Sequence, residues 1–233
     1  MHPGIRIGLI GDVNEQQKAH QAIPKALYAA SNGVECVWIP TDQVTTQALA
    51  ECDGLWCVPG MPYRNAEGAI SAIRHARLTQ TPFLGTSAGF QYAILEFARD
   101  VLGLTEADHQ KSNPKASLPL ISPLSCALAG VKARVRFTDG SHLKKAYKSP
   151  ESVEEYHCSF GLNGRYQRLL EGHDLYVAAV DDQHEVRAVE LDGHPFFVAT
   201  LFEPEMRAGS NPIVESFVAV CMKRKQGATL AAS

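Results

Sequence analysis

The chain has 233 residues, of which 45% are hydrophobic and 20% are charged, and its formal net charge at pH 7 is −3. This length allows a substantial core, and the small negative charge gives no electrostatic basis for binding nucleic acid or an anionic membrane. No apolar run is long enough to span a bilayer and residues 1–10 show no leader pattern, so we expect a cytoplasmic protein.

The six cysteines and nine histidines follow no pattern of a metal site. No two cysteines are spaced as C-x-x-C, and three of them stand inside apolar runs, which is typical of reduced thiols in a core: Cys36, Cys57 and Cys221. The chain also has no G-x-G-x-x-G dinucleotide fingerprint and no G-x-x-x-x-G-K-[ST] phosphate loop. We therefore expect no structural zinc, no other metal and no cofactor.

The first part of the chain predicts strands that alternate with helices. Strands are expected at residues 5–10, 34–39, 55–58 and 82–84, and helices at 22–30, at 66–78 and after residue 88. Pro24 should kink the first helix or begin its regular part. This order predicts an α/β fold with a doubly wound, mostly parallel sheet. Such sheets bind ligands at the carboxyl ends of their strands, where Gly11, Gly60 and Ser87 stand.

The later part of the chain predicts a β-rich half. Residues 111–125 are rich in proline and serine and are expected to form a loop. Strands are expected at 131–137, 153–160, 175–180, 186–191 and 196–202, and helices near 163–170 and at 212–223. We expect one domain over residues 1–226, followed by a flexible tail of small residues at 227–233.

Residues 83–91 have the pattern of a nucleophile elbow, because an apolar strand runs through a Gly-x-Ser-x-Gly motif into a periodic helix. In such an elbow a sharp turn holds the central residue, Ser87, in a strained and exposed position, while Gly85 and Gly89 let the neighbouring backbone pass. The N-terminus of the helix, at Ala88, offers free N–H groups that can stabilise an oxyanion. The structural alternative is a tight strand-to-helix turn that requires only small residues.

Several segments around this elbow resemble one protein family. They are residues 53–60, 63–68, 82–91, 96–104, 113–114, 192–199 and 202–205. In these segments the chain is similar to the class I glutamine amidotransferases, and specifically to the C-terminal glutaminase domain of CTP synthase. The resemblance extends over about residues 5–221 and implies a flavodoxin-like, amidotransferase-type fold and a link to pyrimidine nucleotide metabolism. The resemblance also implies that this chain alone does not make CTP.

The chain departs from this family at the residues that carry the chemistry. The resemblance implies a Cys nucleophile, a His base and a Glu that orients the base. Here Ser87 stands at the position of the Cys and Glu203 at that of the His, while Glu205 is retained. A carboxylate is a poor base for a serine hydroxyl unless burial or a second carboxylate raises its pKa. On a regular strand Glu203 and Glu205 would point to opposite faces, although Pro204 interrupts that regularity.

The residues that the resemblance assigns to glutamine binding differ as well. The oxyanion turn at Gly60-Met61 is one residue shorter than in the family. Lys111 stands where an acidic residue would hold the glutamine ammonium, and Ser159 stands near the position of the arginine for its carboxylate, whereas Gln91 is retained. Lys111 should repel an α-ammonium group. We therefore expect the pocket to bind a small polar or anionic molecule.

Residues 85–89 also resemble the elbow of serine members of this superfamily, the cyanophycinase and peptidase E type. A serine of that type needs a base, and His109, His142 and His157 are the candidates, although each is more readily explained as a surface or core histidine. A laboratory Cys-to-Ser replacement would account for the serine, but not for the other changes in the pocket.

Three functions remain open. The first is a hydrolase or amidase with Ser87 as nucleophile and with Glu203 and Glu205 as its base system. The second is a pseudoenzyme that keeps the fold as a ligand-binding or regulatory partner, and the third is a detached amidotransferase subunit, which the pocket changes disfavour. These changes predict negligible glutaminase activity. The sequence leaves open a homo-oligomer or a synthetase partner, and it predicts no nucleic-acid or membrane partner.

Overall fold

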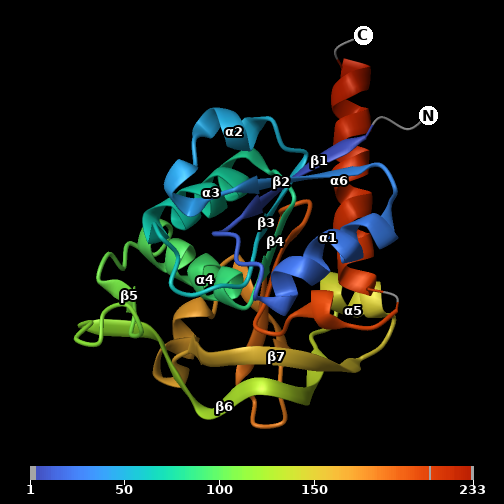
Figure 1. The fold of residues 1–233 in the computed structure, drawn as a ribbon. Helices are drawn as coiled ribbons and strands as arrows, with labels where there is room; N and C mark the ends of the chain where they lie inside the picture. Colours follow the sequence, from blue (N-terminus) through green and yellow to red (C-terminus); the bar gives the residue numbers. More distant parts are fainter. Residues whose placement is uncertain (1–3, 210, 232–233) are drawn as a thin grey trace.

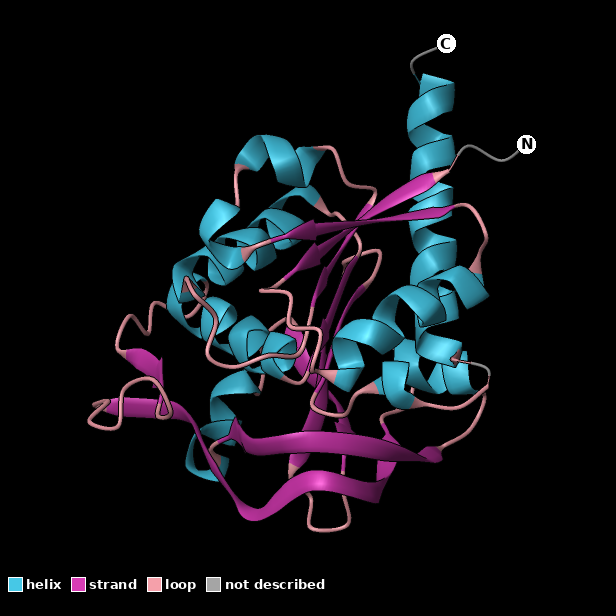
Figure 2. Ribbon diagram, in the orientation of Figure 1, coloured by secondary structure: helices cyan, strands magenta, loops and turns pink. Residues whose placement is uncertain are grey.

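One ten-stranded sheet runs through the molecule, and helices pack on both of its sides (Figure 1; Figure 2). The computed structural model describes residues 4–209 and 211–231. The strand order is β2-β1-β3-β4-β10-β9-β8-β6-β5, and β7 pairs with β6 beside this path. The predicted fold class, a doubly wound and mostly parallel sheet with a β-rich later half, is confirmed.

The half of the sheet from β2 to β10 is parallel. Its strands are β1 (Ile5–Ile10), β2 (Val34–Ile39), β3 (Gly54–Cys57), β4 (Phe83–Thr86) and β10 (Phe197–Thr200). The helices around it are α1 (Lys18–Ala30), α2 (Thr46–Ala50), α3 (Ala66–Thr79), α4 (Ala88–Asp100) and α6 (Pro212–Ala231). In Figure 1, α1 and α6 lie on one side of the sheet and α2, α3 and α4 on the other. Because helices cover both faces of the sheet, these strands are continuous apolar runs and do not alternate between apolar and polar residues.

The remaining strands are mostly antiparallel and extend the sheet beyond β10. They are β5 (Ala107–His109), β6 (Leu118–Phe137), β7 (Glu151–Leu162), β8 (Leu175–Val180) and β9 (Val186–Leu191). A short helix α5 (His142–Tyr147) joins β6 to β7, and 3₁₀ turns occur at Thr41–Gln43, Gly164–Leu170 and Pro204–Met206. Figure 2 shows β6 and β7 as a long ribbon beside the parallel half.

The core sits at the centre of the parallel half. Strands β3, β4 and β10 are buried along their whole length, and α4 is buried from Ala88 to Ala98. The rings of Phe83 and Phe197 pack with centroids 4.5 Å apart, and Trp56 is fully buried nearby in β3. Each such side chain contributes roughly 1.5–3 kcal/mol by its burial. This packing gives the end of β4 a rigid support.

The predicted loop at residues 111–125 is wrong in its second half. Strand β6 begins at Leu118, and it pairs with β7 from Ile121 opposite Leu162. The prolines of this strand stand next to register shifts, where fewer backbone N–H groups are needed: Pro119 in the pairing with β5 and Pro123 in the pairing with β7. The composition signal therefore marked a bulged strand rather than a loop.

Other boundaries also differ from the predictions. Helix α1 begins at Lys18, so Pro24 lies inside the helix and does not begin it. Helix α6 continues to Ala231, eight residues beyond the predicted end at 223. The division into a domain at 1–226 and a flexible tail stays a prediction, and residues 232–233 lie outside the described part. Although α6 is long, no helix among the described residues has both the length and the apolar character needed to cross a membrane.

The last predicted strand, at 196–202, is shorter than expected. Strand β10 ends at Thr200, and Glu203 precedes the 3₁₀ turn Pro204–Met206. Proline has a fixed φ and no N–H group, which favours the first position of such a turn over a central strand. Glu203 and Glu205 therefore do not stand on a regular strand, in agreement with the interruption that Pro204 indicates in the sequence.

Candidate active site

Ser87 forms the predicted sharp turn between β4 and α4, but the prediction that the turn exposes it is wrong, because the packing around the elbow leaves Ser87 only 7% exposed. Its backbone has φ 53° and ψ −101°, a conformation that non-glycine residues rarely adopt and that the surrounding packing must hold in place. The turn also depends on Gly89, because a Cβ atom there would lie 2.2 Å from the carbonyl oxygen of Cys57. The elbow is thus a built feature, in which β3 passes directly against the first turn of α4.

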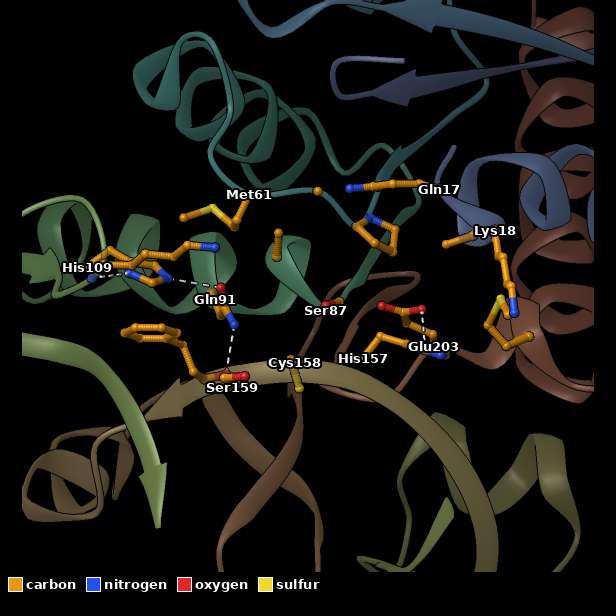
Figure 3. A pocket seen from close by; sticks show the side chains of 17 residues that line it. Gln17, Lys18, Met61, Ser87, Gln91, His109, His157, Cys158, Ser159 and Glu203 are labelled. Carbon is orange, nitrogen blue, oxygen red and sulfur yellow. Dashed lines mark hydrogen bonds and ion pairs between the residues drawn. The ribbon is translucent and has the colours of Figure 1, made fainter. Parts of the chain in front are cut away.

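A cavity of about 480 Å³ opens at the carboxyl ends of β3 and β4, above Ser87 (Figure 3). It collects eight of the nine predicted site residues: Gly60, Met61, Ser87, Ala88, Gln91, Lys111, Ser159 and Glu203. Gly60 has φ +133°, a value that favours glycine in the turn after β3. Gly11, also at a strand end, is not among the described lining residues.

Glu203 lies between Ser87 and His157 in the cavity wall (Figure 3). Its Oε2 atom is 3.0 Å from Nδ1 of His157, and the other ring nitrogen of that histidine is 3.3 Å from Glu155. The Ser87 hydroxyl also interacts with the Glu203 carboxylate and lowers its pKa, although of these two contacts only the one with His157 has the geometry of a regular hydrogen bond.

Glu205 lies beneath the cavity and does not line it. Its Oε1 atom accepts a hydrogen bond of 3.2 Å from the Thr86 hydroxyl, which itself accepts one of 3.0 Å from the indole N–H of Trp56. Its Oε2 atom is buried and has no hydrogen-bond partner within the described structure. Both Glu203 and Glu205 are only 4% exposed, so the turn at Pro204 buries both carboxyl groups.

These surroundings raise the pKa values of the two carboxyl groups to different extents. Burial, together with repulsion from Glu203, raises the pKa of Glu205 well above its usual value, which favours the protonated form of this group. Burial raises the pKa of Glu203 as well, but His157 and Ser87 oppose that rise. Glu203 is therefore the group that ionises first, and it is the one that faces the serine. Of the two carboxyl groups, Glu203 is thus the better candidate for a base and Glu205 the better candidate for a neutral partner.

Gln91 is locked at the other side of the cavity by His109. The backbone N–H of Lys111 donates to Nδ1 of His109 at 3.1 Å, so Nε2 carries the hydrogen and donates to Oε1 of Gln91 at 3.0 Å. The Gln91 amide nitrogen then donates to the carbonyl oxygen of Phe160 at 2.8 Å. Burial and the charge of Lys111 lower the pKa of His109 to about 4, so this histidine is neutral at pH 7.

The structure separates the three candidate histidines. His109 and His157 line the cavity, whereas His142 starts α5 and its ring packs against Phe196, 5.3 Å away. The two histidines in the cavity are not placed to act as the base of Ser87. His109 is bonded to Gln91, and Glu203 stands between Ser87 and His157. Lys18 lines the cavity and was not predicted. No local signal marks it, because its place depends on how α1 packs against α6 and against the 3₁₀ turn Pro204–Met206.

Comparisons with known proteins place this fold in a family. The family model described as glutamine amidotransferase class-I matches residues 13–219. The chain is 30% identical to CTP synthase of Saccharolobus solfataricus over 92% of its length and 44% of that protein, and 32% identical to CTP synthase of Methanopyrus kandleri over 88% and 42%. The chain therefore spans less than half the length of these curated relatives.

Solved structures give the same fold. The Trypanosoma brucei CTPS glutaminase domain with bound acivicin superposes with a TM-score of 0.86 at 23% identity, covering 94% of each chain. A glutamine amidotransferase from Thermotoga maritima superposes with a TM-score of 0.60 at 13% identity, covering 99% of this chain and 84% of that one. At these identities the superpositions establish the arrangement of elements around the cavity.

Proposed function

Because this chain belongs to the class-I glutamine amidotransferase family, as a glutaminase-like domain related to CTP synthase, we propose that it hydrolyses a small amide or ester with Ser87 as its nucleophile. The observation that carries this proposal is the position of Glu203. Its buried carboxylate faces the strained serine, and its pKa is raised above the ordinary value of a glutamate. A raised pKa makes a carboxylate a better proton acceptor near neutral pH.

The proposed reaction has two stages. The Ser87 hydroxyl oxygen attacks the substrate carbonyl carbon while its proton passes to Glu203, and the N–H groups at Ala88 and the Gly60 turn stabilise the oxyanion. The C–N or C–O bond then breaks, and Glu203 returns the proton to the amine or alcohol that leaves. In the second stage a water molecule attacks the acyl group under the same base, which releases a carboxylic acid and restores Ser87.

Several substitutions argue against free glutamine as the substrate. By the family resemblance, the thiol, the imidazole and both charges that would anchor glutamine are replaced, at Ser87, Glu203, Lys111 and Ser159. Loss of one member of a catalytic triad commonly costs several orders of magnitude in rate. We therefore expect negligible release of ammonia from glutamine. Turnover of about 1 s⁻¹ or faster, an ordinary enzyme rate, would contradict the proposal.

A fluorophosphonate probe tests the nucleophile without knowledge of the substrate. An activated Ser87 attacks the phosphorus and displaces fluoride, so intact-mass analysis should show one adduct on the wild type and peptide mapping should place it on Ser87. Ser87→Ala should remove the adduct and Glu203→Gln should slow its formation by about 100-fold or more. Ser125→Ala is the matched control, because Ser125 is exposed on β6 and bonds to Glu185 away from the cavity.

The alternative function is a ligand-binding or regulatory pseudoenzyme. It is favoured by the regular hydrogen bond of Glu203 to His157, which would hold the carboxylate away from catalysis. Absence of the adduct on the wild type, together with absence of hydrolysis of any activated ester, would support this alternative. A detached amidotransferase subunit, working with a synthetase partner, requires ammonia release, and the glutamine assay above tests it directly.

A further inference from the structure

We propose that the acyl part of the substrate ends in an anionic group, a carboxylate or a phosphate, which Lys111 and Gln91 bind at the His109 side of the cavity. This inference rests on the proposed hydrolase function. Figure 3 shows His109 and Gln91 on one side of Ser87, and Glu203 and Lys18 on the other. A substrate that reacts at Ser87 can therefore extend one end toward Gln91 and the other toward Lys18.

The balance of charge at the His109 side favours an anion. Lys111 lines the cavity, and no carboxylate lies within ion-pair distance of it among the described residues. The nearest carboxyl group in sequence, that of Asp108, is bound by Arg99 at 3.1 Å and by Asn113 at 2.9 Å, and it does not line the cavity. Lys111 is an exposed residue at the edge of the cavity, and its charge acts on His109, so this side of the cavity carries a positive charge without a counterion among the described residues.

The orientation of Gln91 adds a donor at the same place. Its oxygen accepts from His109 and one of its two amide hydrogens is used by Phe160, so the second N–H remains for a ligand. His109 is neutral, and Ser159 supplies a hydroxyl in the same wall. This side of the cavity therefore offers an ammonium, an amide N–H and a hydroxyl, which together match the acceptor oxygens of a carboxylate or phosphate.

The same arrangement selects against other substrates. A cationic group at this side would meet Lys111 without a carboxylate to offset the repulsion. A neutral alkyl end would leave the amide N–H of Gln91 without a partner in the closed complex, which costs binding free energy. We therefore expect binding of the anionic group to decide which acyl groups are accepted, while Ser87 and Glu203 perform the reaction.

Two matched activated esters test this preference. The probes are the 4-nitrophenyl monoester of adipic acid, whose far end is a carboxylate, and the same compound with that end capped as a methyl ester. A third ester, with a phosphonate at its far end, distinguishes the two anion sources. We expect kcat/KM of the wild type to be about tenfold or more higher for an anionic ester than for the capped one, after subtraction of the Ser87→Ala rate.

The variants assign the preference to its residue. Lys111→Ala should bring the ratio of kcat/KM for the anionic ester to kcat/KM for the capped ester close to one. Lys111→Glu should make the capped ester the better substrate. Lys115→Ala is the control, because Lys115 is exposed in the same loop and does not line the cavity. A Ser87-dependent hydrolysis with no preference for the anion, or a preference that survives in Lys111→Ala, would overturn the inference and leave the hydrolase standing.

A binding measurement separates the inference from the proposed function. If no ester is hydrolysed, calorimetric titration with adipate and with inorganic phosphate still decides whether the anion site exists. Binding by the wild type that weakens about tenfold or more in Lys111→Ala supports the site. No binding of either anion, or equal binding by the two proteins, overturns it.

Discussion

Glu203 combines burial, a histidine partner and contact with a strained serine, so in the proposed hydrolysis its protonation would control the activity of the site. Burial raises its pKa from the ordinary value, while the charge of His157 lowers it. A base must be ionised to accept a proton from Ser87. Activity is therefore expected to rise with pH through a pKa above 4.5.

The pH dependence gives a prediction for His157. In His157→Gln the hydrogen bond to Glu203 can be kept but the favourable charge is lost, so the pKa of Glu203 should rise further. The acid limb of kcat/KM for an activated ester should then move to higher pH than in the wild type, as measured between pH 4 and 8. A limb that stays in place, or that moves to lower pH, would show that His157 does not tune this carboxylate.

At the scale of single elements, the elbow was the most predictable feature of the molecule. Small residues between an apolar strand and a periodic helix form a local pattern, and the structure has the predicted turn at Ser87. The β6–β7 ribbon was less predictable, because its pairing joins residues far apart and is interrupted near Pro123. For the same reason, sequence alone could not show that β7 would bring His157 next to Glu203.

The close contact of β3 with the elbow predicts that adding one methyl group at Gly89 strongly destabilises the fold. A Cβ atom at Gly89 would lie 2.2 Å from the Cys57 carbonyl oxygen, so either β3 or α4 must move. We expect Gly89→Ala to lower the free energy of unfolding by about 3 kcal/mol or more, measured by urea denaturation. Gly164→Ala is the control, since no atom lies within 4 Å of its Cβ position and its φ is not positive. A similar stability for both variants would contradict the close contact.

At the scale of the whole molecule, the cavity lies between two parts of the sheet that differ in burial and in strand pairing. One wall belongs to the parallel half, where β4 lies between β3 and β10 and is completely buried. The other wall is β7, which pairs only with β6 among the described strands and alternates between buried and open positions. The backbone N–H of Glu203 donates to the Glu155 carbonyl oxygen at 2.9 Å and so connects the two.

This difference predicts how the molecule opens. Amides in β6 and β7 should exchange with solvent through openings of lower free energy than amides in β4 and β10, by about 2 kcal/mol or more. Native-state hydrogen exchange at increasing denaturant concentration, read by mass spectrometry of peptides, measures both sets in one sample. Equal opening free energies in the ribbon and the central strands would show that the sheet unfolds as a single cooperative unit.

The chain of contacts from Trp56 through Thr86 to Glu205 has an optical consequence. The indole N–H bonds to the Thr86 hydroxyl and that hydroxyl bonds to Glu205, so a charge appearing on Glu205 changes the electric field at the indole ring. The protein has two tryptophans. The other one, Trp38, lies in β2 and packs beside His20 of α1, away from these hydrogen bonds. In a Trp38→Phe background the emission wavelength of Trp56 therefore becomes a label-free readout of the proton on the buried carboxyl group beneath Ser87.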